Sequence, residues 1–384
     1  MPYLLRILGP EKYGAVVLAQ AVVTFGVLLT EYSFNFTATQ KISQERNDIQ
    51  KMSSAFWNIQ FAKTLLAAGA VAGIFLISAL VPKLRAEQGI IAATTPLIVG
   101  AVLFPQWFFQ GVERMLPITI CSVVARLMSL PLLFLFVNKA EDAWKAAMIQ
   151  SSTTMLAGLI AAWMIYRARL ITPVFPRFAE VRQCYKEGWP IFAANIAISI
   201  YTVLNPIILG FVTSNAQVGM FGAADKIRSA AQGMLSPISL AAFPRVNVLM
   251  ADSQSKASKF VRKLLLLQGG LALAMSVVII AFAPQIVRIV MGSRFEDAIP
   301  VLRTLGFLPF VVGLSNVLGV QIMLPFGMKK EFSKIVTCSA ILSILLIALL
   351  GYFAMAWGAA TGVLVAELFV TVAMFATLKK KKIF

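Results

Sequence analysis

The 18 residues Thr64–Val81, TLLAAGAVAGIFLISALV, contain no charged side chain. An uncharged apolar run of this length makes up most of a helix that crosses the hydrocarbon core of a bilayer. Only helices and closed barrels satisfy every backbone polar group in lipid, and the residue alternation of barrel strands is missing here. The stretch therefore predicts a transmembrane helix, and similar segments recur to the end of the chain.

The whole chain repeats this composition. Its 384 residues are 59% hydrophobic with a mean hydropathy of +0.83, whereas a soluble domain is about 45–50% apolar. We predict an all-α polytopic membrane protein with eleven full spans. The spans cover 12–36, 54–82, 89–111, 116–138, 143–166, 187–211, 216–243, 263–291, 297–324, 331–354 and 357–378.

The first ten residues, MPYLLRILGP, read as the end of one more span. No charged region or cleavage site of a signal peptide precedes them. We expect an incomplete first helix, with about 20 residues missing upstream, the length of one span.

The net charge of +18 follows the predicted topology. With the 37–53 loop placed in the cytoplasm, 21 of the 34 lysines and arginines fall on that side and 6 on the other. This split follows the positive-inside rule and predicts a cytoplasmic C-terminus. Because topology accounts for most of the basic excess, we expect no nucleic-acid partner.

The sequence lacks the residues that several kinds of metal site and catalytic site require. The chain has no histidine, three cysteines and no phosphate-binding G-x-x-x-x-G-K-[ST] loop, which excludes histidine metal sites, histidine triads and ATP hydrolysis through that loop. The longest loop, 167–186, is too short for a folded catalytic domain. We expect a protein that is not an enzyme and that has no metal site and no cofactor.

Two motif pairs indicate an internal duplication. EKYGA (11–15) and GMFGA (219–223) each open a span, 208 residues apart. FFQGVERM (108–115) and LPFGMKKE (324–331) each end one, with their glycines 216 residues apart. Transporters are often built from such repeats, with the substrate path at the repeat interface. We predict two halves, 1–170 and 171–384.

Polar side chains form stripes on three predicted spans. On an ideal helix, Gln20, Thr24, Glu31 and Asn35 fall on one face together with Tyr13. Helix 216–243 carries a second stripe of Asp225, Arg228, Gln232, Ser236 and Ser239. Helix 187–211 adds Asn195, Ser199 and Thr202. Polar residues can join packed helices, but a charge pair with amides along one face favours a water-filled cavity.

The charges within the spans are mostly positive. Arg6, Arg288 and Arg303 lie close enough to span ends to extend their charges to the interface, and we interpret Lys63 in the same way. Three other bases, Arg126, Lys226 and Arg228, remain inside the membrane. A cationic pocket suits an anionic head group such as a diphosphate. We hypothesise that Arg228, with Lys226 or Arg126, contacts it and that Asp225 holds Arg228 in the empty cavity.

The stretch FPQWFFQGVERM (104–115) gathers aromatic and amide side chains at the end of a span. Trp107 and its neighbours could form an interfacial belt or brace the helices, because WFF wraps around the helix. The alternative is that they stack on sugar rings, with Gln106 and Gln110 donating hydrogen bonds to hydroxyls. Both interpretations stay open at this point.

Five motifs together resemble a known family, the Wzx-type O-antigen flippases. This family belongs to the polysaccharide-transport branch of the multidrug/oligosaccharidyl-lipid/polysaccharide exporter superfamily. The motifs run from Pro2 to Asn247, and the later spans match in hydropathy only. They are PYLLRILGPEKYG, EYSFNFTATQKIS, FPQWFFQGVERM, VGMFGAADKI and PISLAAFPRVN.

The resemblance implies two pseudo-symmetric six-helix bundles around a central cavity that opens alternately to each side of the inner membrane. It implies flipping of an undecaprenyl-diphosphate-linked oligosaccharide from the cytoplasmic to the periplasmic leaflet. It also implies coupling to a proton or a sodium ion, and other polysaccharide-assembly membrane proteins are candidate partners. A drug or cation antiporter of the same fold is the alternative, and a polysaccharide-synthesis enzyme is a weaker one.

Overall fold

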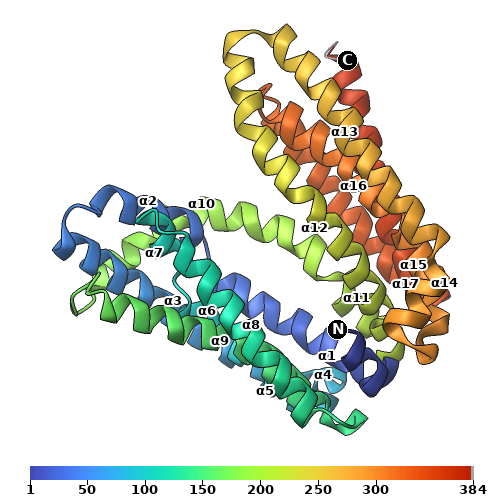
Figure 1. Cartoon of the computed structure of the whole chain (residues 1–384), viewed down its shortest axis with the longest axis horizontal. Helices are drawn as coiled ribbons and strands as arrows, with labels where there is room; N and C mark the ends of the chain where they lie inside the picture. Colours follow the sequence, from blue (N-terminus) through green and yellow to red (C-terminus); the bar gives the residue numbers. More distant parts are fainter. Residues whose placement is uncertain (382–384) are drawn as a thin grey trace. The chain divides into compact units, whose positions relative to one another are not determined.

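A computed structural model describes the backbone of residues 1–381, and their side chains except at 194, 195, 197, 198, 200–202, 251, 254 and 255. Regular structure in this described part is entirely helical (Figure 1). The chain divides into two compact units. The N-terminal unit is Ala15–Ser199, and the C-terminal unit combines Met1–Gly14 with Ile200–Phe384.

The N-terminal unit begins within α1 (Pro2–Glu31) and ends within α10 (Phe178–Val203). Around α9, the helices α5, α6 and α8 pack together, while α2 packs on α3 and α7. The remaining bounds are α2 (Phe34–Glu45), α3 (Ile49–Leu80), α4 (Pro82–Ala86), α5 (Gln88–Thr94), α6 (Pro96–Leu103), α7 (Gln106–Gly111), α8 (Leu116–Phe136), the 3-10 turn η1 (Ala140–Asp142) and α9 (Ala143–Arg167).

In the C-terminal unit, α13 packs on α12 and α16, and α17 packs on α11, α15 and α16. Two of its segments, η2 and η4, are π-helical. The bounds are α11 (Asn205–Val212), α12 (Asn215–Asp252), α13 (Gln254–Ala281), α14 (Ala283–Ile286), η2 (Val287–Met291), η3 (Ser293–Ala298), α15 (Ile299–Leu305), α16 (Leu308–Asn316), η4 (Val317–Met323) and α17 (Lys329–Lys380).

A break in the backbone separates the last two predicted spans. A left-handed Met355 (φ 53°) interrupts α17. The chain reverses there, because Gly362 lies against Ile347 and Gly358 against Leu350. The 52 residues of α17 are thus two antiparallel helices, as predicted for 331–354 and 357–378.

The predicted 37–53 loop is mostly helical. After α1 ends, α2 continues to Glu45, and only 46–48 separate it from α3. The side chain of Asp48 caps α3 by accepting hydrogen bonds from Gln50 N at 3.0 Å and Lys51 N at 3.1 Å. These hydrogen bonds lower the pKa of the Asp48 carboxyl below its usual range.

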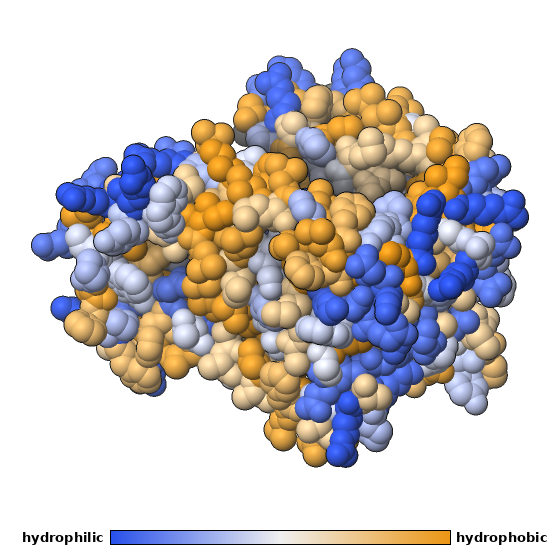
Figure 2. Space-filling view, turned by 60° about the horizontal axis from the view of Figure 1, so that its bottom comes forward, coloured by the Kyte–Doolittle hydropathy of each residue, from blue (hydrophilic) through white to orange (hydrophobic). Residues whose placement is uncertain are grey.

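Eight helical segments of the described residues are long and apolar enough to cross a membrane, and one of them is the doubled α17. Figure 2 shows apolar side chains over wide areas of the surface, with hydrophilic side chains gathered apart from them. The prediction of a polytopic α-helical membrane protein is confirmed.

The compact units are defined by contacts, and the halves 1–170 and 171–384, which are predicted from the motif repeats, stay a prediction. The first fourteen residues pack with the C-terminal unit, and the N-terminal unit runs from Ala15 to Ser199. The cause is a close helix crossing between two of the repeated motifs. A Cβ at Gly14 would overlap the carbonyl oxygen of Asn215, and one at Gly219 would overlap that of Pro10. Glycine at both positions lets α1 and α12 approach this closely.

Candidate functional site

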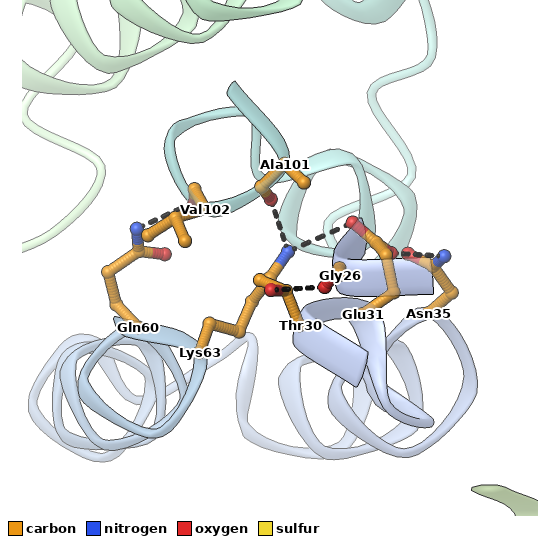
Figure 3. Close-up of polar contacts among 8 residues, drawn as sticks. All are labelled: Gly26, Thr30, Glu31, Asn35, Gln60, Lys63, Ala101 and Val102. Carbon is orange, nitrogen blue, oxygen red and sulfur yellow. Dashed lines mark hydrogen bonds and ion pairs between the residues drawn. The ribbon is translucent and has the colours of Figure 1, made fainter. Parts of the chain in front are cut away.

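Pro105 creates two hydrogen-bond acceptors inside the N-terminal unit. It has no N–H to donate to the carbonyl of Ala101, one helical turn before it. The next amide, Gln106 N, bonds to the Phe104 carbonyl instead of that of Val102. Two side chains of α3 take their places: Gln60 Nε2 lies 2.7 Å from Val102 O, and Lys63 Nζ lies 2.6 Å from Ala101 O (Figure 3).

Lys63 also binds Glu31, at the end of α1. Its Nζ lies 3.2 Å from Glu31 Oε1, while Asn35 Nδ2 donates to Glu31 Oε2 at 2.6 Å (Figure 3). The Lys63 side chain is fully buried, whereas that of Glu31 is 26% exposed. The interpretation that Lys63 extends to the interface is therefore wrong, because a carboxylate and a free carbonyl hold its charge inside the protein.

The chain breaks directly after Glu31. Tyr32 is left-handed (φ 51°), a conformation that costs a non-glycine residue roughly 1–2 kcal/mol. Contacts with α10 hold it there: its hydroxyl donates to Tyr185 O at 2.9 Å, and its ring stacks on Phe192 at 4.4 Å. Gly188 allows α10 to approach, because a Cβ there would overlap Ser33 Oγ.

A cavity of about 240 Å³, called the Glu31 cavity below, lies at this break. Its polar lining includes Glu31, Asn35 and Ser199, and its aromatic lining includes Phe36 and Phe192. Glu31, Asn35 and Ser199 belong to the stripes of the predicted helices 12–36 and 187–211, and the central cavity predicted from those stripes stays a prediction. The remaining lining residues are Leu28, Tyr32, Ser33 and Ile196.

Other predicted residues of this unit lie elsewhere. Gln20 is half-buried, further back along α1. Tyr13 is buried in the C-terminal unit against Phe295, so the predicted stripe does not continue to the start of the helix. The side chain of Asn195 lies outside the described residues.

Trp107 has no exposed surface and packs at 5.4 Å against Phe56. Phe108 and Phe109 are equally buried. These rings form neither a lipid-facing belt nor a face open to sugar, and their contacts are those of the bracing role. Gln110 accepts a hydrogen bond from Thr39 at 3.4 Å, and Gln106 is half-buried.

In the C-terminal unit, Asp225 and Arg228 pair as their spacing predicts. Arg228 Nη2 and Nε lie 2.7 and 2.8 Å from Asp225 Oδ1, with Arg228 20% exposed and Asp225 36%. Lys226 is exposed next to them, and Gln232 is half-buried. Arg126 is exposed on α8 and belongs to the N-terminal unit, so its predicted proximity to Arg228 stays a prediction.

The sequence interpretation placed Ser239 on a polar stripe but missed its partners from other helices. Ser239 Oγ lies 2.9 Å from Asn316 Oδ1 and 3.3 Å from Gln268 Oε1. Gln321 Nε2 donates to Ser239 O at 2.9 Å. Gln268 and Gln321 are buried within apolar helices, a signal that the sequence already carried. The described residues contain no group of three or more acidic, histidine or cysteine side chains able to hold a metal ion.

The family that matches this chain is described as "Polysaccharide biosynthesis protein", over residues 1–250. This chain belongs to that family. It is 36% identical over 382 residues to a protein of Escherichia coli (strain K12), covering 100% of this chain and 92% of that protein. It is 28% identical to a Shigella dysenteriae protein, covering 99% and 94%. Both relatives are named "Putative O-antigen transporter".

Comparison with solved structures shows the fold of this chain. An inward-facing multidrug-resistance MATE transporter of the MOP superfamily matches with a TM-score of 0.76 and 13% identity, covering 98% of this chain and 92% of that one. The lipid II flippase MurJ, in an inward closed conformation, matches with a TM-score of 0.67 and 11% identity, covering 98% and 85%. At these identities the likeness shows the MOP-type fold, and the relatives' names agree with the motif resemblance to O-antigen flippases.

Proposed function

We propose that this protein flips an undecaprenyl-diphosphate-linked oligosaccharide from the cytoplasmic to the periplasmic leaflet for O-antigen or related polysaccharide assembly. The names of its relatives support transport of an O-antigen precursor. The positive-inside charge distribution supports an inner-membrane protein with a cytoplasmic C-terminus.

The Glu31 cavity is the observation that carries this proposal. A carboxylate and an amide, Glu31 and Asn35, lie beside the aromatic side chains of Phe36 and Phe192. Sugars present hydroxyl groups around their edges and C–H groups on their faces, so carboxylates and aromatic rings together suit them. Lys63 neutralises Glu31 from behind and leaves the carboxylate partly open to the cavity. For the diphosphate, Arg228 of the C-terminal unit remains our candidate ligand.

Coupling to a proton or sodium ion, and contact with other polysaccharide-assembly membrane proteins, belong to the same proposal.

The drug-antiporter alternative gains no support from the MATE likeness, because 13% identity shows fold alone. The apolar and aromatic lining of the cavity contains one acid, Glu31, and that acid is already paired. A site that collects cationic drugs would instead offer an unpaired negative charge.

Complementation of a flippase-null strain tests the proposal. We expect the wild-type chain to restore O-antigen on the cell surface. Phe36→Leu should reduce export, because it removes an aromatic ring from the lining of the cavity. Protein levels should stay normal, because Phe36 is 63% exposed and its replacement leaves no void in the core. Phe175→Leu is the matched control, since Phe175 is 94% exposed and lies outside the cavity. A wild-type chain that fails to restore O-antigen, or a Phe36→Leu variant that exports normally, would contradict this function and this cavity, respectively.

A further inference from the structure

A second polar cavity of the N-terminal unit lies where the segment 168–177 joins α9 to α10. Its volume is about 670 Å³, and it shares no lining residue with the Glu31 cavity. Residues of α2, α3, α10 and the joining segment line it. They are Lys41, Glu45, Gln50, Lys51, Ser54, Ala55, Thr172, Val174, Arg177, Glu180 and Gln183.

Hydrogen bonds to buried residues hold the joining segment against α3. Thr172 N donates to Ser53 Oγ at 2.9 Å, and Trp57 Nε1 donates to Thr172 O at 3.0 Å. Arg177 N donates to Asn58 Oδ1 at 2.7 Å. Ser53 and Asn58 have no exposed surface. Because the segment is bonded to the same helix at its middle and at its C-terminal end, the wall of the cavity is built into the fold.

The carboxyl groups of the two acids in the cavity, Glu180 and Glu45, differ in how many hydrogen bonds they accept. Glu180 accepts hydrogen bonds from Asn58 and Ser54 and lies 3.7 Å from Arg177. Glu45 lines the cavity with its Oε2 atom buried and without a hydrogen-bond partner among the described residues. A buried carboxylate oxygen without a donor costs free energy, so the arrangement favours a ligand that brings an O–H or N–H group.

The rim supplies the opposite charge. Lys41, Lys51 and Arg177 line the same cavity, and the side chains of Lys51 and Arg177 are 73% and 78% exposed. Ammonium and guanidinium groups bind phosphate oxygens through charge-assisted hydrogen bonds. A ligand with one phosphate group and neighbouring hydroxyls would meet both demands at once.

We infer that this cavity binds a phosphate ester that carries free hydroxyl groups, with Lys41, Lys51 and Arg177 on the phosphate and Glu45 on a hydroxyl. Two sources share this chemistry. One is the head group of phosphatidylglycerol, and the other is the sugar phosphate of a glycosylated lipid. The site would stand whether or not the protein flips oligosaccharides, because it is separate from the Glu31 cavity.

Binding measurements on the purified full chain test the inference. One arm titrates N-acetylglucosamine 1-phosphate and inorganic phosphate into protein in uncharged detergent, followed by calorimetry. The other arm compares retention of phosphatidylglycerol and phosphatidylcholine from mixed nanodiscs. We expect at least one hydroxyl-bearing phosphate ester to bind, and the arm that responds identifies the source.

Paired variants separate this site from general attraction of anions. Lys51→Gln with Arg177→Gln should weaken binding about tenfold, the effect of losing charge-assisted hydrogen bonds. Arg182→Gln with Lys186→Gln removes the same charge from a neighbouring surface of α10 and should leave affinity within about twofold, since only screened long-range attraction changes. Glu45→Gln should reduce the preference for the sugar phosphate over inorganic phosphate. Failure of both esters to bind, or equal losses in the two double variants, would overturn the inference while leaving export by complementation unaffected.

Discussion

The ammonium group of Lys63 is fully buried and bonds at once to the carboxylate of Glu31, 32 residues earlier in the chain, and to the carbonyl of Ala101, 38 residues later. This contact joins α1, α3 and α6 of the N-terminal unit at the wall of the Glu31 cavity (Figure 3). We propose that the pair serves both the packing of the unit and the binding of substrate in the cavity.

Variants of the pair separate these two roles. Glu31→Gln removes the counter-charge of a buried ammonium group, and breaking such a pair costs about 3–5 kcal/mol. We expect little protein in the membrane by immunoblot. Glu31→Gln combined with Lys63→Met removes both charges and should restore protein level, but surface O-antigen should stay low because the cavity has lost its carboxylate. Normal export by this double variant would show that the pair is only structural.

The pair of Asp225 and Arg228 supports a charge-swap experiment. Exchanging the two residues keeps an ion pair three residues apart but moves the positive charge by almost one helical turn. A purely structural pair should tolerate the exchange, whereas an arginine that binds phosphate should not. We expect Asp225→Arg with Arg228→Asp to accumulate in the membrane and fail to export O-antigen. Export near the wild-type level would remove Arg228 as a candidate ligand.

The crossing of α1 and α12 predicts opposite effects for two glycines of the same helix. Gly219→Ala places a methyl group on the Pro10 carbonyl, and backbone cannot move aside as a side chain can. We expect a loss of about 3 kcal/mol in unfolding free energy. Gly233→Ala meets no atom within 4 Å and should be neutral or stabilising by about 0.5–1 kcal/mol. Thermal unfolding in detergent measures both, and equal melting temperatures for the two variants would argue against the close crossing.

Determining the membrane topology by cysteine labelling requires a cysteine in an exposed position. Native Cys184 is 6% exposed, and burial raises the pKa of its thiol, so less thiolate is present at pH 7 and labelling is slow on either side of the membrane. We propose Phe175→Cys and Glu141→Cys, each in a chain with the three native cysteines changed to alanine. An impermeant maleimide on intact spheroplasts should label Glu141→Cys only, and permeabilised cells should label both. Rapid labelling of Phe175→Cys in intact spheroplasts would reverse the assigned orientation.

Much of the helical organisation could be predicted from the chain alone. Uncharged apolar runs such as Thr64–Val81 have to form helices in lipid, and most predicted spans match helical segments of the structure. Glu31 and Asn35 were assigned to one face by their spacing of four residues, and they do lie together in the cavity. Helical periodicity is not the physical reason, because α1 ends at Glu31 and the chain breaks at Tyr32 before α2 begins at Phe34. A hydrogen bond from Asn35 Nδ2 to Glu31 Oε2 joins the two side chains across this break.

Tertiary structure decided which polar and aromatic side chains of the spans are buried or paired. Lys63 looked like an interfacial lysine because neither of its acceptors is near it in sequence: one comes from the end of α1, and the other exists because Pro105 cannot donate to Ala101. Trp107 is buried because α2 packs on α7 and the ring of Phe56 from α3 lies 5.4 Å from its own. Sequence by itself determined which segments enter the membrane, since transfer to lipid depends on the composition of each segment. Which polar side chain is paired, buried or open to a cavity depended on contacts between helices distant in the chain, and only the fold brings those together.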